Sequence, residues 1–103
     1  MKPSTPSSAA PRAFTARQRR LLAAGIRSEI KHLQRCLRLL PLVDREVYAA
    51  GRDLFTTDAA LALWLCQPAR SLDGKIPMRR LRPVKGRREV AGILGAIANG
   101  VYL

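Results

Sequence analysis

The chain has 103 residues, of which 48% are hydrophobic, and its 19 Lys and Arg outnumber seven Asp and Glu to give a formal net charge of +12. This length leaves room for one small domain, and the charge implies attraction to a polyanion or an acidic protein surface without indicating a fold. The longest apolar run, Ala59–Cys66, is too short to span a bilayer, so we expect a soluble, cytoplasmic protein.

Residues 1–14 read MKPSTPSSAAPRAF and are rich in Pro, Ser and Ala. They show no apolar periodicity, and no apolar segment of the kind found in secretory signals follows the first lysine. We therefore expect residues 1–14 to be a disordered tail.

Residues 15–41 are predicted to form one long amphipathic helix rather than a complete helix-turn-helix. Thr15 and Gln18 have the spacing of a capping box, and Pro41 stops the helix. One stripe is apolar and consists of Leu22, Ile26, Ile30, Leu33, Leu37 and Leu40. The opposite side is basic and consists of Arg17, Arg20, Arg27, Lys31, Arg35 and Arg38.

The two stripes of this helix each allow two interpretations. The basic stripe could contact DNA phosphates, or it could be a solvated face or meet an acidic partner. No aromatic residue interleaves the cations, and few amides or hydroxyls accompany them, so base reading is weakly supported. The apolar stripe has near-heptad spacing and could bind a second copy of the chain, or it could cover the core.

Residues 42–103 are predicted to form a compact helical domain. The expected elements are helices over 42–55 and 58–66, a loop over 69–76, one helical turn over 78–81 and a last helix from Gly86 to Gly100. Gly51 should leave room for a neighbouring helix. The predicted fold class is therefore all-α: a small helical domain with a long basic amphipathic N-terminal helix.

The last predicted helix has two different faces. One is apolar and should face the core: Val90, Ile93, Leu94 and Ile97. The other consists mainly of small residues: Gly92, Gly95, Ala96 and Asn99. Such a face suits either a tightly packed internal helix pair or an exposed docking surface. Val101, Tyr102 and Leu103 follow as an apolar segment that we expect to insert into something.

The sequence does not supply a recognisable catalytic set. With one His, two separated Cys and seven acids, no nucleophile–base pair or carboxylate dyad emerges. Cys36 and Cys66 are interpreted as buried or half-buried thiols, and His32 one turn before Cys36 does not complete a metal site. We expect a binding module without enzymatic activity, metal or cofactor.

The second half of the chain resembles the toxin-binding domain of the MbcA/ParS/Xre antitoxin family. The resemblance covers roughly Val47 to Leu103. It is carried by residues in a fixed order and spacing: Trp64-Leu65, Pro68, Leu72, Gly74, Pro77, Leu81, Gly86, Val90, Leu94, Ile97 and Gly100-Val101-Tyr102.

This resemblance implies an all-helical antitoxin of a type II toxin–antitoxin system. Members of the family neutralise a toxin, commonly a RES-domain enzyme that consumes NAD, and tend to form homo-oligomers. Their last helix and C-terminus block the entrance of the toxin's active site. Carried over to this chain, the toxin-binding residues are Arg88, Gly95, Asn99, Gly100, Val101, Tyr102 and Leu103.

Two functional hypotheses therefore stand. The first is an antitoxin that occludes the active site of a protein toxin with its C-terminus. The second is a small basic DNA-binding or transcriptional regulatory protein that uses the cations from Arg17 to Arg38. Truncation of the C-terminal residues and charge reversal on the long helix should affect the two activities in opposite ways.

Overall fold

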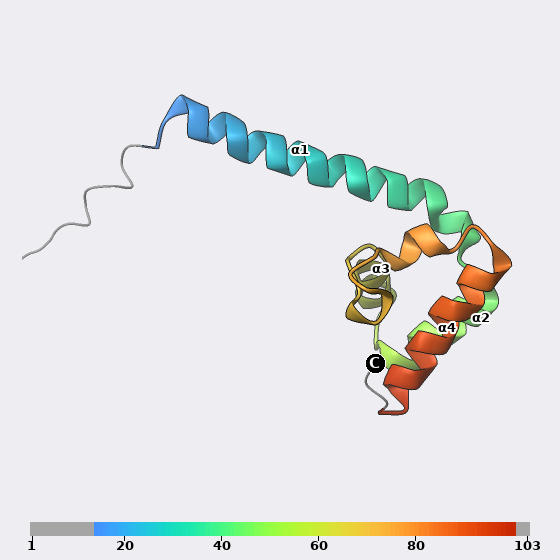
Figure 1. Cartoon of the computed structure of the whole chain (residues 1–103). Coiled ribbons are helices and arrows are strands. Elements are labelled where there is room, and N and C mark those ends of the chain that lie inside the picture. Colours follow the sequence, from blue (N-terminus) through green and yellow to red (C-terminus); the bar gives the residue numbers. More distant parts are fainter. Residues whose placement is uncertain (1–13, 101–103) are drawn as a thin grey trace, which may run out of the picture. The chain divides into compact units, whose positions relative to one another are not determined.

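The computed structural model describes residues 14–100, and their regular structure is helical (Figure 1). Four α-helices follow in order: α1 (Ala16–Leu39), α2 (Arg45–Leu54), α3 (Asp58–Leu65) and α4 (Val84–Ala98). Short 3-10 helices lie between them: η3 (Leu40–Leu42), η4 (Arg70–Leu72) and η5 (Pro77–Arg80). The described residues contain no strand, only an isolated bridge between Ala69 and Lys75. The predicted all-α class with a long N-terminal helix is confirmed.

The described residues divide into two compact units, one that ends at His32 and one that begins at Leu33. In the first, α1 begins as predicted: the N–H of Thr15 donates to Gln18 Oε1 at 2.7 Å, and the N–H of Gln18 donates to Thr15 Oγ1 at 3.1 Å. Leu22, Ile26 and Ile30 are 58%, 62% and 48% exposed. Cys36, near the other end of α1, is that helix's single fully buried residue.

The starts of α2 and α4 differ from the sequence prediction. Asp44 Oδ1 accepts from the N–H of Val47 at 2.9 Å, so α2 begins at Arg45 rather than at Leu42. The α4 helix begins at Val84 because extended Pro83 presents its carbonyl to the N–H groups of Gly86 and Arg87. Gly86 is therefore inside α4 rather than at its start.

The core of the second unit lies between α2, α3, η5 and α4. Val47, Leu81, Val90 and Leu94 have no measurable exposure, and Met78 is 1% exposed. These residues belong to one apolar cluster that also includes Cys36 at the end of α1. Burial of such side chains supplies about 1.5–3 kcal/mol each.

Close packing of α2 on α3 depends on Gly51. A Cβ at Gly51 would overlap the side chain of Leu61, which is itself buried. This confirms the prediction that Gly51 admits a neighbouring helix. Trp64 is half-buried and packs against Phe55 with ring centroids 6.4 Å apart.

Candidate functional site

The face of α4 that points away from the core carries the candidate binding residues. Arg88, Gly92, Gly95 and Asn99 recur at steps of four, three and four, and so lie along one stripe of the helix. Arg88, Gly92 and Asn99 are exposed, and Gly95 is half-buried. On the opposite side, Val90, Ile93 and Leu94 are buried as predicted, and Ile97 is half-buried.

The small residues of this stripe are not used for internal packing by the described part of the chain. A Cβ built at Gly92 or at Gly95 would meet no atom within 4 Å beyond the helix's own backbone. Of the two alternatives left open by the sequence, the structure therefore selects an outward-facing surface over an internal helix pair.

The end of α4 adds a second, backbone-defined part of this surface. The N–H of Asn99 donates to the carbonyl of Gly95, and the N–H of Gly100 donates to the carbonyl of Ile97. Gly100 has a φ of 82°, the left-handed conformation that ends many helices and favours glycine. Val101, Tyr102 and Leu103 lie outside the described residues, so their predicted role as an inserting segment stays a prediction.

The start of α4 is fixed by Gly86 and Arg87. A Cβ at Gly86 would overlap the backbone carbonyl oxygen of Arg80, so this close approach requires glycine. The Arg87 guanidinium donates to the carbonyls of Leu81 and Arg82 at 2.8 and 3.2 Å, and its Nε lies 3.5 Å from Asp44 Oδ2. These contacts hold the start of α4 against the end of η5 and against Asp44, the N-cap of α2.

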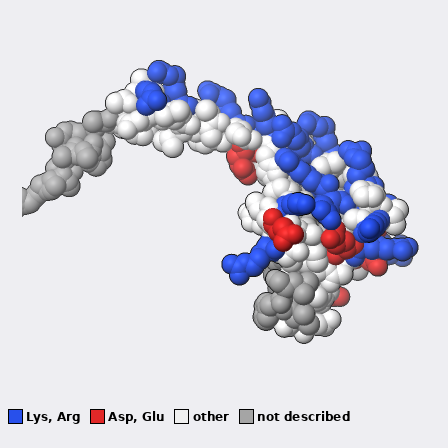
Figure 2. All heavy atoms as spheres, in the orientation of Figure 1, with Lys and Arg blue, Asp and Glu red and all other residues white. Residues whose placement is uncertain are grey.

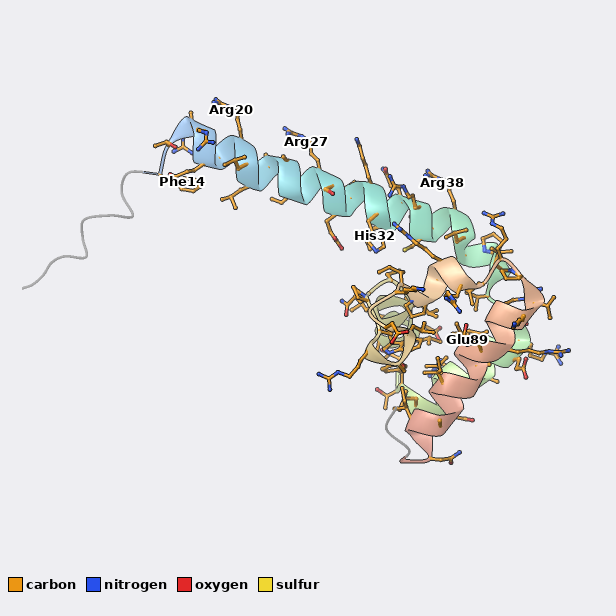
Figure 3. All side chains as sticks on the ribbon, viewed as in Figure 1. Phe14, Arg20, Arg27, His32, Arg38 and Glu89 are labelled. Atoms are coloured by element: carbon orange, nitrogen blue, oxygen red, sulfur yellow. The ribbon has the colours of Figure 1, made fainter. Side chains whose placement is uncertain are left out.

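The six cations predicted as possible DNA contacts are all exposed: Arg17, Arg20, Arg27, Lys31, Arg35 and Arg38. Within the first unit, Arg20 and Arg27 project from the same side of α1, and His32 projects from the other (Figure 3). Within the second unit, Arg35 and Arg38 line a hollow together with Leu39, Arg79 and Arg82.

Arg79 and Arg82 were not predicted from the sequence as site residues. Each of them directly follows a core residue, Met78 or Leu81. This placement of a cation after a core residue, in the segment MRRLR, is the sequence signal that could have predicted the two arginines as a pair. In Figure 2, Lys and Arg atoms gather over this part of the second unit.

A surface cluster of Tyr48, Arg52 and Asp58 links α2 to α3. Arg52 lies 2.6 Å from Asp58 Oδ1, and the Tyr48 hydroxyl donates to the same oxygen at 2.8 Å. The hydrogen bond from Tyr48, followed by that from Arg52, holds the pKa of Asp58 below its ordinary value of 3.8. Arg52 also donates to the carbonyls of Phe55 and Thr56, so this cluster stabilises the turn before α3.

Residues 14–100 show neither a metal-binding cluster nor a membrane-spanning helix. They contain no group of three or more His, Cys, Asp or Glu placed to hold a metal ion. No helix within these residues combines the length and the hydrophobicity that a membrane span requires. Cys36 is buried and Cys66 half-buried, as interpreted from the sequence.

Comparison with known families identifies the segment that carries the α4 surface. Residues 50–100 match the model of the antitoxin Xre/MbcA/ParS C-terminal toxin-binding domain. This segment belongs to that family. No curated protein and no solved structure gives a significant match. The family domain thus runs from the middle of α2 to Gly100 and includes the whole described part of the outward stripe of α4.

Proposed function

We propose that this chain is the antitoxin of a type II toxin–antitoxin system and binds its protein toxin through the outward stripe of α4 and the residues that follow it. The observation that carries the proposal is the coincidence of the toxin-binding family match with an open stripe of small residues. The two glycines in this stripe carry no side chain, so a partner's backbone can approach the helix closely there.

The proposed mechanism is occlusion of the toxin's active site. Gly100 turns the chain out of α4 through its left-handed conformation, and Val101, Tyr102 and Leu103 come directly afterwards. In this proposal the three residues enter the substrate cleft of a RES-type, NAD-consuming toxin. Arg88, Gly95 and Asn99 contact the surface around the cleft entrance.

The experiment compares the full chain with a variant that ends at Gly100. Each is co-purified with the toxin encoded beside it, and NAD consumption and binding affinity are measured. We expect the truncated chain to lose inhibition of NAD consumption while it still binds the toxin through α4, with weaker affinity. Full inhibition by the truncated chain would contradict occlusion, and a toxin that does not consume NAD would contradict the RES assignment.

The exposed apolar stripe of α1 supports a further part of the proposal, which is self-association of two copies of the chain. Leu22, Ile26 and Ile30 are large apolar side chains that remain exposed to solvent among the described residues of their unit. In the second unit, an apolar groove of about 460 Å³ adds a second uncovered apolar surface. It is lined by Leu33, Cys36, Leu37, Leu40, Ala59, Ala62, Leu63, Cys66 and Met78. A second copy presents the same near-heptad stripe and would cover such side chains.

Light scattering after gel filtration tests this self-association. The full chain should be a dimer or a higher oligomer, and a variant with Ile26→Glu and Ile30→Glu should be monomeric. Ala24→Glu adds a carboxylate at an exposed position off the stripe and should leave the oligomer intact. A monomeric full chain would refute this part of the proposal.

A further inference from the structure

The second unit contains a hollow of about 430 Å³ whose lining is dominated by arginine. Arg35 and Arg38 come from the last turns of α1, Arg79 comes from η5, and Arg82 comes from the segment between η5 and α4. Leu39 is the remaining lining residue. Segments far apart in the sequence thus bring four arginine residues to the lining of one hollow.

These arginines stand on fixed backbone, because each one is next to a residue of the core. Cys36, Met78 and Leu81 are at most 3% exposed and directly neighbour Arg35, Arg79 and Arg82. Arg38 precedes Leu39, which packs against the same core cluster.

Gly86 and Arg87 also fix the backbone around the hollow. The contact of Gly86 with the Arg80 carbonyl seats α4 against η5. The hydrogen bonds from Arg87 to the carbonyls of Leu81 and Arg82 hold the backbone that carries Arg82. The arrangement therefore lowers the ordering cost of binding an anion.

The hollow is electrostatically one-sided. Its lining residues, all within the described part of the chain, include no carboxylate. A neighbouring hollow that shares Arg79 adds Arg80, Lys85 and Glu89. There Arg80 and Glu89 lie 2.6 Å apart, so the one carboxylate is already paired. A group of cations on one surface attracts polyanions.

The chemistry of the lining favours phosphate in a nucleic-acid backbone over an acidic protein. Guanidinium groups bind phosphate oxygens through paired hydrogen bonds. Protein–protein interfaces centre on aromatic and apolar anchors, whereas protein–DNA interfaces are polar and strongly positive. Leu39 is the single apolar residue here, and the absence of any aromatic residue from the lining leaves no platform for base stacking.

We infer that Arg35, Arg38, Arg79 and Arg82 form a site for the backbone phosphates of a nucleic-acid duplex, bound without base reading. Arg35 and Arg38 were already predicted as possible DNA contacts, and the second unit adds Arg79 and Arg82 to them. The site does not rest on the antitoxin proposal, because none of its four arginines lies on the outward stripe of α4.

Fluorescence anisotropy of the full chain with a short labelled DNA duplex, and with an RNA duplex of the same sequence, tests the inference over a salt series. Each phosphate contact contributes about 0.9 to the slope of log affinity against log salt concentration. The variant with Arg79→Gln and Arg82→Gln should bind more weakly and reduce the slope by about 1–2. Affinity for either duplex supports the site. Affinity for one duplex alone shows whether the site binds the phosphates of DNA or of RNA.

The matched control is Arg45→Gln, which removes one charge from an exposed position on α2 outside both hollows. It should change the slope by less than half as much as the double variant. Circular dichroism verifies that the variants are folded, and Arg35→Gln with Arg38→Gln provides a second double variant that leaves η5 untouched.

Three results would overturn the inference. The first is no duplex binding by the full chain at about 50 mM salt, where phosphate contacts are strong. The second is a slope that neither double variant reduces beyond the Arg45→Gln control. The third is equal affinity for a polyglutamate peptide with the same loss in the double variants, which would assign the hollow to an acidic protein.

Discussion

Replacing Gly95 by arginine should have opposite effects on the stability of the fold and on toxin binding by the α4 stripe. A Cβ at this position meets no atom of residues 14–100 within 4 Å, so these residues leave room for a side chain to begin there. Arginine is about 1 kcal/mol more favourable than glycine inside a helix. A cation in the last turn of a helix also interacts favourably with the helix dipole. The variant should therefore be more stable than the wild type.

The expected magnitudes can be checked by thermal unfolding and by a binding titration. A gain of about 1 kcal/mol corresponds to a rise in Tm of about 4–8 °C for a domain of this size. An arginine inserted into a closely packed interface should cost at least about 2 kcal/mol of toxin binding, a typical hot-spot value and roughly a 30-fold loss of affinity. Gly95→Ala should give a similar gain in stability with a much smaller loss of affinity.

Ala24→Arg is the matched control, because it places the same side chain on an exposed position of α1. It should leave the affinity for toxin unchanged. Toxin binding by Gly95→Arg within about twofold of wild type would refute the assignment of the stripe as the toxin-binding surface. A Tm several degrees below wild type would refute the reasoning that this face is open.

Gly86→Ala should destabilise the fold by about 1–3 kcal/mol, the usual cost of overpacking, because the new methyl group overlaps the Arg80 carbonyl. Urea unfolding measures the loss of stability, and an unchanged midpoint would show that the contact relaxes freely. Asp58→Asn should reduce the acid sensitivity of folding, as measured by Tm against pH. The lowered pKa of Asp58 stabilises the folded state above the ordinary value of 3.8, and this contribution is lost as the pH falls through the lowered pKa. The difference in Tm between wild type and Asp58→Asn should therefore shrink below that pH, and a constant difference would contradict the role given to the carboxylate.

Local features of the fold could be predicted from the sequence because their causes are local. The capping box of Thr15 and Gln18 and the start of α3 after Thr57 depend on residues within one turn. The close approach at Gly51 also followed from a glycine placed among core positions. The resemblance that identified the toxin-binding domain depends on ordered spacing along the chain, and the family match confirmed it.

Features that depend on tertiary contacts could not be predicted in the same way. An apolar stripe on a helix looks the same whether it covers its own core or stays open for a partner, and Leu22, Ile26 and Ile30 turned out to be exposed. The role of Gly86 required knowledge that Arg80 approaches it. The arginine hollow required α1 and η5 to meet, which the periodicity of either segment alone does not indicate.

Photo-crosslinking from α4 tests most directly whether its outward stripe binds the toxin. A benzophenone amino acid is placed at Asn99, or at Arg45 on α2 as a control, and the full chain is irradiated in complex with its toxin. If the stripe binds the toxin, we expect a crosslink to the toxin from position 99 and none from position 45. A crosslink from position 45 and none from position 99 would contradict toxin binding by the stripe.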